Sequence, residues 1–416
     1  MIYGILYEIN FWLKNFKLTT QEKNMSGYHF LFVPGPSNVP AAVQQAIHCP
    51  MEDHRNPTIP DLIMPINEDL KKILLTKTGR VVFFPSSGTG CWEAALQSTL
   101  NIGDKVLGAS FGQFSMLWLD MCKRLGFEPI TMEEEWGTGA NPENYHKHLS
   151  ADKNHEIKAV LVCQNETATG VRSDVKAIRK VLDDLNHPAL LMVDGVSSVA
   201  SYEFKMEEWG VDCVVSGSQK GFMLPAGLGI LGVSQKAIEK MKESTYPTCY
   251  FDVVDMMAKL DGGYLPYTPP VNLLRGFRVA IDLILKEGIE NIWKRHHRLA
   301  EGTRQAITNG WGLNLCAKEE KWHSDTVSAI VVPDGADAVP VISTAFHKYN
   351  LALGAGLAKV AGKVFRIGHL GDLNECMLFG AISGAEMAMI DNGIKVEPGS
   401  GAAAASKYWT ENPGDK

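Results

Sequence analysis

From about residue 80 to residue 235, short apolar runs alternate with amphipathic stretches that have helical periodicity. Several of the runs are almost continuously apolar, which is typical of strands buried on both faces of a parallel sheet. The predicted strands are Val81–Pro85, Lys105–Ser110, Pro129–Glu133, Ile157–Gln164, Ala189–Val196, Cys213–Ser218 and Gly229–Val233. The pattern predicts an α/β domain with a mostly parallel seven-stranded sheet, and ligands of such a sheet bind at the carboxyl ends of its strands.

Two of the intervening helices have recognisable ends. Ser173 is the predicted N-cap of an amphipathic helix that places Val175 and Ile178 on one face. Another helix is expected from about Phe114 and stops before Gly126. Both helices would cover the predicted sheet.

The C-terminal third has a different pattern. One long helix is expected over residues 270–302, and it would leave the α/β domain. An α+β pattern follows, with a strand at 327–332, a helix near 341–349 and a strand at 363–368, while the Gly/Ala-rich stretch 399–405 is expected to be flexible or loosely helical.

A chain of 416 residues is too long for one small core, so two domains are expected. We predict a large domain over residues 25–285 that includes an N-terminal arm, and a smaller C-terminal α+β domain over residues 286–416. Residues 1–24 resemble neither a signal peptide nor a transit peptide, and we expect a poorly ordered extension there.

Composition excludes several classes of partner. The net charge of −7 argues against a nucleic-acid partner. No apolar run approaches the roughly 20 residues of a membrane-spanning helix. The eight cysteines show no metal-ligand spacing and are expected to be reduced thiols. The chain ends Pro413–Lys416, which is not a peroxisomal signal, so we expect a cytoplasmic protein.

Two charged residues follow buried strands of the predicted sheet. Asp194 ends the run Leu191–Val193, and Lys220 follows Ser216–Gln219. A lysine at such a position can form an imine with an aldehyde cofactor, and a neighbouring aspartate can keep a pyridinium nitrogen protonated. Each residue alone has a plainer explanation, a helix cap for Asp194 and a solvated terminus for Lys220. Together they indicate pyridoxal 5′-phosphate chemistry.

A glycine-rich turn follows the first strand. In Pro85–Glu93, glycines allow backbone N–H groups to approach an anion at a helix N-terminus, and Thr89 adds a hydroxyl donor. The turn is neither a Walker A loop nor a dinucleotide fingerprint, so a phosphate without a nucleotide is the preferred ligand. An ordinary tight turn is the alternative.

Two further polar sites accompany these. Asn165–Gly170 lies at another strand end, where its hydroxyls could reach a cofactor oxygen. Arg366 lies within the apolar strand of the small domain, where a guanidinium requires an anionic partner and matches a carboxylate bidentately. The alternatives are a polar turn and an internal salt bridge.

Taken together, these segments resemble the class V aminotransferases of PLP fold type I, and within them the serine–glyoxylate and alanine–glyoxylate aminotransferases. The resemblance runs from about Phe30 to Ala405. The matching motifs are Pro34–Pro40, Ser87–Leu96, Asn165–Gly170, Val193–Ser198, Glu208–Asp212, Gly217–Lys220, Pro266–Pro269 and Ala361–Gly371.

The resemblance implies roles for individual residues. Lys220 is the Schiff-base lysine, Asp194 is the pyridinium partner and Arg366 binds the substrate carboxylate. The remaining cofactor contacts that it implies are Thr89, Gly90 and Cys91 at the phosphate, Phe114 on the ring face, and Thr167 and Gln219.

The resemblance also implies a homodimer with shared active sites. Thr268 and a nearby tyrosine, Tyr264 or Tyr267, would reach the phosphate of the neighbouring subunit's cofactor. His54 and Arg55 would overhang the substrate pocket of that subunit. These two residues bear on the choice of amino donor.

The implied reaction is transamination between an amino acid and glyoxylate, which yields glycine and a 2-oxo acid. Serine is the preferred donor and would give hydroxypyruvate, with alanine and aspartate as alternatives. A cysteine desulfurase or related lyase is a more distant alternative, and a catalytically inactive scaffold is a third. Lyases usually place a histidine where this chain has Phe114.

Overall fold

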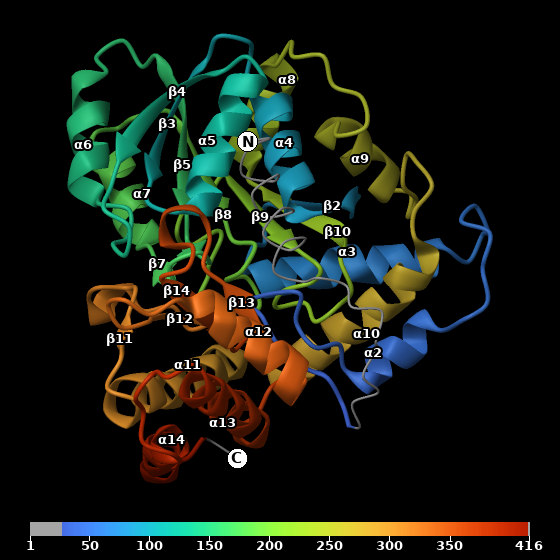
Figure 1. Ribbon diagram of the computed structural model, residues 1–416. Helices are drawn as coiled ribbons and strands as arrows, with labels where there is room; N and C mark the ends of the chain where they lie inside the picture. The colour runs from blue at the N-terminus through green and yellow to red at the C-terminus, as the bar shows by residue number, and fades with distance from the viewer. Residues whose placement is uncertain (1–26, 415–416) are drawn as a thin grey trace.

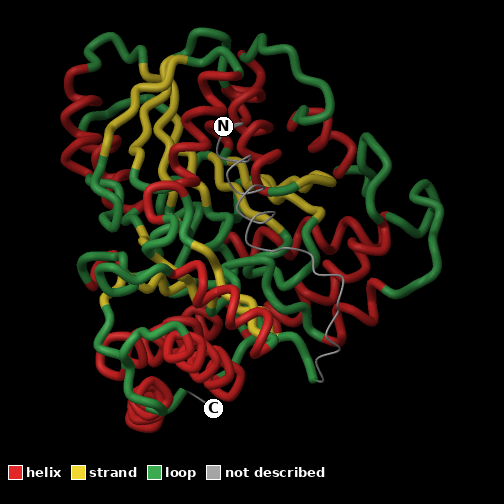
Figure 2. Tube along the Cα trace, in the orientation of Figure 1, coloured by secondary structure: helices red, strands yellow, loops and turns green. Residues whose placement is uncertain are grey.

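Two β-sheets, each with its own cluster of buried apolar side chains, organise the chain (Figure 1). The computed structural model describes residues 27–414, so the extension predicted for residues 1–24 lies outside the described residues. Figure 2 shows strands from both sheets surrounded by helices. The two-domain bounds given above remain a prediction.

The larger sheet has seven strands and is mostly parallel, as predicted. In spatial order its strands are β2 (Arg80–Ser86), β10 (Gly227–Val233), β9 (Cys213–Gly217), β8 (Leu190–Asp194), β5 (Ile157–Cys163), β3 (Lys105–Ser110) and β4 (Glu128–Glu133). Only β10 runs antiparallel to its two neighbours within this sheet. Every predicted strand end lies within two residues of the observed end.

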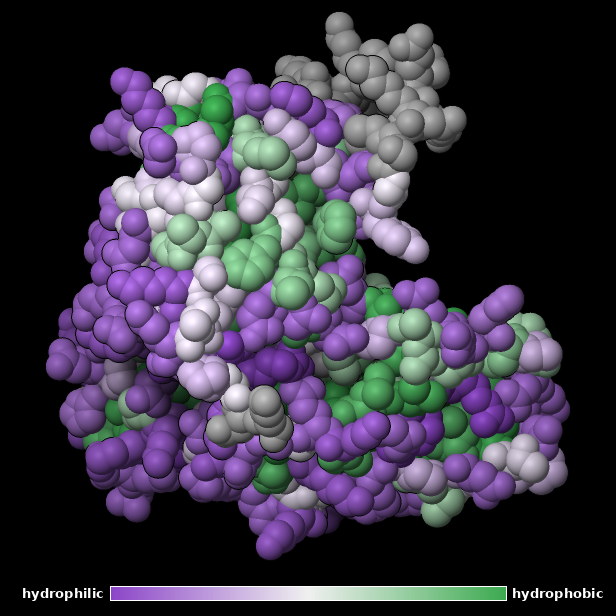
Figure 3. Space-filling model, turned by 90° about the horizontal axis from the view of Figure 1, so that it is seen from below, coloured by the Kyte–Doolittle hydropathy of each residue, from purple (hydrophilic) through white to green (hydrophobic). Residues whose placement is uncertain are grey.

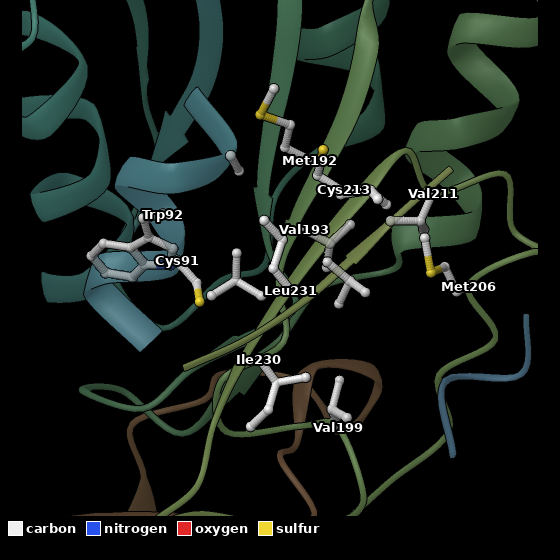
Figure 4. Packing of buried hydrophobic residues seen from close by; sticks show 14 of the residues in the cluster. Cys91, Trp92, Met192, Val193, Val199, Met206, Val211, Cys213, Ile230 and Leu231 are labelled. Carbon is white, nitrogen blue, oxygen red and sulfur yellow. The ribbon is translucent and has the colours of Figure 1, made fainter. Parts of the chain in front are cut away.

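Helices cover both faces of this sheet. On one face lie α4 (Gly88–Thr99) and α5 (Gln113–Arg124). On the other lies α10 (Val271–Glu287), whose Phe277 ring packs 6.1 Å from Phe83 and 5.6 Å from Phe222. Figure 4 shows Cys91 of α4 on the side opposite Ile230 of β10. Because successive side chains of a strand point to opposite faces, the sheet contributes apolar residues to a layer on each side.

The other helices around the larger sheet connect its strands or flank it. They are α2 (Ala41–Ile47), α3 (Pro60–Leu74), α6 (Pro142–Ala151), α7 (Val175–Asp184), α8 (Gln235–Glu243) and α9 (Val253–Leu260). A short antiparallel pair, β6 (Asn165–Glu166) with β7 (Val171–Arg172), follows β5.

The smaller sheet draws on both ends of the described chain. Its order is β1 (Phe30–Phe32), β13 (Leu351–Ala355), β14 (Val364–Gly368), β12 (Val327–Val331) and β11 (Asn314–Leu315). β1 pairs with β13 in parallel, and the remaining pairs are antiparallel. Packed around it are α11 (Ile289–Gln305), α12 (Ala338–Tyr349), α13 (Glu375–Asp391) and α14 (Ser400–Glu411).

Two sequence predictions about helices were wrong, and a third, a flexible or loosely helical stretch over 399–405, was right only in its helical alternative. The expected single helix over 270–302 is two helices, α10 and α11, because Gly288 adopts φ 87° and ends the first of them. The N-cap of α7 is Asp174, whose carboxylate accepts from Ala177 N–H at 2.9 Å, while Ser173 is buried and accepts from Ala140 N–H. Residues 400–405 belong to the ordered helix α14, which Trp409 anchors to the α11 carbonyl of Arg298.

Within residues 27–414, no helix is both long enough and apolar enough to span a membrane.

Candidate active site

Asp194 and Lys220 lie at the same edge of the larger sheet. Asp194 is the last residue of β8, and it pairs with Val215 of the neighbouring parallel strand β9. Lys220 follows the end of β9 by three residues, in a turn. Because parallel neighbours end at one edge, the fold brings the two predicted groups together at the carboxyl ends of adjacent strands.

The segment Pro34–Ser37 from the N-terminal part of the chain lies across Lys220. The Lys220 Nζ donates to the Pro34 carbonyl, and Ser37 Oγ donates to the Lys220 carbonyl at 2.8 Å. A Cβ at Gly35 would lie only 2.3 Å from Lys220 Nζ, and the φ of 113° at this position also favours glycine. The sequence alone marks this motif but does not connect it with the lysine.

The surroundings of Lys220 favour its neutral amine. Burial lowers the pKa of Lys220 from 10.5 to about 8. The guanidinium of Arg366 lowers this pKa as well, while the carboxylate of Asp194 raises it. An amine of this kind can act as a nucleophile or base near neutral pH.

Asp194 is 5% exposed, and both of its carboxylate oxygens are engaged. Val196 N–H donates to Oδ1 at 2.8 Å, and the Cys163 thiol lies 3.8 Å from Oδ2. Burial is the main reason that the pKa of Asp194 is raised to about 7; the charge of Glu166 acts in the same direction, and Lys220 opposes it. A buried carboxylate of this kind gains most from a positively charged partner.

The first turn of α4 forms the predicted phosphate end. Thr89 is exposed, and Gly90 is buried. The Cys91 side chain is fully buried, and its Sγ lies 2.6 Å from where a Cβ would stand at Gly229. Burial raises the pKa of the Cys91 thiol, and the N–H groups of Gly90 and Cys91 donate to the Ser87 carbonyl at 3.0 and 3.4 Å.

Polar side chains from segments that follow β5 and β8 and precede β12 meet beyond β5. Asn165 Nδ2 donates to Ser197 Oγ at 2.7 Å and to Thr326 Oγ1 at 2.9 Å. Thr167 Oγ1 lies 2.9 Å from the same Ser197 hydroxyl. Thr167 was predicted here, whereas Ser197 and Thr326 were not, because Thr326 precedes a strand of the smaller sheet.

Arg366 reaches this cluster from the middle of β14. It is 6% exposed, its Nη1 donates to the Thr167 carbonyl at 2.9 Å, and its Nε donates to the Ala355 carbonyl at 2.9 Å. Arg366 also acts electrostatically on Lys220. The predicted carboxylate-binding arginine therefore lies at the junction of the two sheets, beside the lysine.

Other predicted residues lie elsewhere on the same chain. Arg55 and Thr268 are exposed, and His54 is half-buried. The Asp53 carboxylate accepts from Arg55 N–H at 3.0 Å and lies 3.9 Å from His54 Nδ1.

The two candidate tyrosines differ in their surroundings. Tyr264 is half-buried and packs against the core of the larger sheet. Tyr267 is 42% exposed and stacks on Tyr250, with its hydroxyl 3.7 Å from Cys249 Sγ.

A profile of the class V aminotransferases matches residues 29–367. The chain belongs to the class V aminotransferases. It is 58% identical over 384 residues to a serine–glyoxylate aminotransferase of Hyphomicrobium methylovorum, covering 92% of this chain and 95% of the relative. An L-aspartate–glyoxylate aminotransferase of Paracoccus denitrificans is 48% identical over 387 residues, covering 93% and 98%.

A solved structure has the same fold. The pyridoxamine–pyruvate aminotransferase of Mesorhizobium loti superposes with a TM-score of 0.87 at 26% identity, covering 93% of this chain and 98% of that one. The protein is thus an aminotransferase of PLP fold type I, as the sequence predicted in preference to a lyase, and its cofactor is pyridoxal 5′-phosphate.

The residues present fit this cofactor. Ser216 Oγ and Gln219 Oε1 are buried and have no hydrogen-bond partner among residues 27–414, which leaves two polar atoms for a ligand. Both residues lie near the start of α4: the Cβ position of Gly217 is 3.0 Å from Gln219 Oε1 and 3.5 Å from Gly88 N, and the Cβ position of Gly88 is 3.5 Å from the Ser216 carbonyl oxygen. The Lys220 amine and the Asp194 carboxylate supply the reactive ends.

Proposed function

We propose that this chain transfers the amino group of L-serine to glyoxylate and so forms hydroxypyruvate and glycine. One observation carries the proposal. The amine of the half-buried Lys220, whose pKa is lowered, lies where both a carboxylate and a guanidinium act on it. The first can serve a ring nitrogen and the second a substrate carboxylate. The 58% identity with the serine–glyoxylate enzyme supports serine as the donor.

Each residue has a distinct task in the proposed reaction. When bound, pyridoxal 5′-phosphate supplies a conjugated ring that accepts electrons from the Cα–H bond. The Lys220 amine would take the proton from Cα of the amino acid and later release it to the cofactor carbon that bears the aldehyde. Asp194 would hold a proton on the ring nitrogen.

Residues around these two hold the cofactor in place. The first turn of α4, at Thr89, Gly90 and Cys91, would bind the phosphate through the threonine hydroxyl and the positive end of the helix. Phe114, Thr167 and Gln219 would contact the ring and its substituents.

Arg366 serves both half-reactions because serine and glyoxylate each carry a carboxylate next to the reacting carbon. Its two bonds to main-chain carbonyls fix the plane of the guanidinium before substrate arrives. A preorganised fork loses less freedom on binding a carboxylate than a flexible ammonium would lose.

Aspartate is the second candidate donor, because the Paracoccus enzyme named for it shares 48% identity with this chain. Alanine is the third, as the sequence resemblance implied. A coupled assay with serine, aspartate and alanine at saturating glyoxylate decides among them. The proposal predicts the highest kcat/KM for serine, and a clear preference for another donor contradicts it.

We also propose that the active unit is a homodimer. His54, Arg55, Thr268 and one of the two tyrosines, Tyr264 or Tyr267, would each complete the site of a second copy. Apolar side chains lie exposed near these residues, since Met51 is 83% exposed and Met64 is 48% exposed. Figure 3 shows apolar side chains gathered in patches on the face seen from below. A cytoplasmic location is proposed as well, since all eight cysteines are free thiols.

Complementation tests the shared sites. Lys220→Ala and Arg55→Ala protomers are each expected to form impaired homodimers. Refolded together, they form mixed dimers in which one site has both native residues, and activity returns in part. If mixing restores no activity while light scattering shows dimers, the two residues serve the same site from one chain.

A further inference from the structure

Helix α5, which carries Phe114, begins without an N-cap side chain of its own. Its N-cap is Gly112, and the Ser115 hydroxyl accepts from Gly112 N–H at 3.0 Å. This supplies only one half of a capping box. The N–H groups of the first turn need an acceptor from another part of the chain.

Glu166 supplies that acceptor from 52 residues further along the chain. Its Oε2 accepts from Phe114 N–H and from Ser115 N–H, both at 3.0 Å. Its Oε1 accepts from Ala168 N–H at 3.1 Å, and the side chain is fully buried. One carboxylate therefore joins the start of α5 to the loop that contains Thr167.

Gly112 makes room for this arrangement. A Cβ at position 112 would lie 2.1 Å from Glu166 Cγ, which is less than any non-bonded contact allows. The backbone of Gly112 is extended, with φ −176°, so other residues could adopt its conformation. The glycine is thus required by the neighbouring glutamate and not by the chain's own geometry.

The loop end of Glu166 leads to the arginine. Thr167 lies between Glu166 and Ala168, and its carbonyl accepts from Arg366 Nη1 at 2.9 Å. Glu166 therefore makes hydrogen bonds in two directions. One oxygen binds the backbone at Phe114, and the other binds the loop whose Thr167 carbonyl accepts from Arg366.

We propose that Glu166 is a positioning residue that sets the ring-stacking aromatic and the carboxylate-binding arginine relative to each other. The inference rests on the proposed function, because it takes Phe114 as the ring contact and Arg366 as the substrate contact. A cap that served stability alone would stabilise α5 without affecting either contact.

The test compares two lost N-caps. Glu166→Ala removes the α5 cap, and the control Asp174→Ala removes the exposed cap of α7 on the outside of the molecule. Both variants are expected to lower Tm. Only Glu166→Ala is expected to weaken cofactor binding by the apoenzyme and to raise KM for serine, each by about tenfold or more. It should also change the visible circular dichroism of the bound cofactor.

A second substitution separates the hydrogen bonds to the first turn of α5 from the hydrogen bond to Ala168 N–H. Gly112→Ser alone clashes with Glu166 and should lower both Tm and cofactor affinity. In the Glu166→Ala background the clash is gone, and the serine hydroxyl can cap α5 directly. The double variant is then expected to regain Tm and cofactor affinity. Its KM for serine should stay raised, because the hydrogen bond from Ala168 N–H to Glu166 is still missing.

Several outcomes would overturn the proposal. Equal effects of Glu166→Ala and Asp174→Ala on cofactor affinity and KM would reduce Glu166 to a stabilising cap. If the double variant recovers Tm but not cofactor affinity, the cap does not position Phe114. If it recovers KM for serine in full, Glu166 does not position Arg366. If Glu166→Ala does not fold, Glu166→Gln replaces it. The glutamine NH₂ cannot accept a hydrogen bond, so the N–H groups that one Glu166 oxygen accepts from lose their acceptor.

The proposed function and this inference fail differently. Wild-type protein that binds no pyridoxal phosphate, or that does not transaminate glyoxylate, refutes the function. Wild-type protein that does both, with Glu166→Ala matching the control, refutes only the role of Glu166.

Discussion

The pKa of Lys220 depends on its neighbours, some of which lower it and one of which raises it. With a pKa of about 8, roughly one amine in ten is neutral at pH 7 in the cofactor-free protein. At the ordinary value of 10.5 the neutral fraction would be about 300-fold smaller. Burial is the largest cause of the lowering, and Arg366 is the next.

Two variants shift this pKa in opposite directions. Arg366→Gln removes a positive charge that disfavours the ammonium ion, so the titration midpoint of Lys220 should rise. Asp194→Asn removes the negative charge that stabilises the ammonium ion, so the midpoint should fall. The neutral fraction at pH 7 therefore decreases in the first variant and increases in the second.

Carbon-13 NMR of protein labelled at lysine Cε measures the midpoint, with Lys220→Met to assign the resonance. Lys348 provides an internal comparison, because Asp391 raises its pKa and it should titrate above 10.5. A Lys220 midpoint near 10.5, or shifts of the same sign in the two variants, would refute the electrostatic account of the site.

Three further outcomes are expected from steady-state kinetics and absorbance spectra. Arg366→Lys should raise KM for serine and for glyoxylate together, by about 10- to 100-fold, because an ammonium cannot replace the supported fork; a rise for one substrate alone would contradict a shared carboxylate site. Asp194→Asn should keep the cofactor absorbance but lower kcat on the order of 100-fold or more, since a neutral amide stabilises the ring proton poorly; undiminished kcat would assign that proton to another group. Arg55→Ala should lower kcat/KM for serine and aspartate by the equivalent of about 1.5–3 kcal/mol, with little effect on alanine, because only the first two donors carry a polar side chain; equal losses for all three would remove this residue from the donor pocket.

Much of the larger sheet was predictable because its strands carry their own signal. A run such as Leu190–Val193 is apolar throughout, since both faces of a central parallel strand are buried. A charged residue that ends such a strand stands out for the same reason. The amino-acid sequence alone therefore singles out Asp194, and Lys220 stands out as the charged residue that follows the next strand by three positions.

The smaller sheet was only partly predictable, because some of its pairings join distant segments. β1 has three residues and pairs with β13, more than 300 positions away, so neither its length nor its neighbours identify it. The break between α10 and α11 depends on the positive φ of one glycine inside a helical pattern. A local pattern does not record such long-range or single-residue effects.

Contacts around the site were the least predictable feature. Glu166 was recognised only as part of a polar turn, because its role depends on the missing side chain of Gly112. Gly35 likewise is explained only once Lys220 lies against it. A glycine that is needed because a distant side chain lies against it cannot be recognised from the local sequence pattern.

Trapping of the cofactor tests the central claim most directly. Borohydride reduction of the protein loaded with pyridoxal phosphate fixes the cofactor to the lysine that holds it, and peptide mapping identifies that lysine. We expect the modification at Lys220, with none at this position in protein reduced after a saturating serine half-reaction without glyoxylate. Modification of another lysine, or equal labelling with and without serine, would contradict the proposed site.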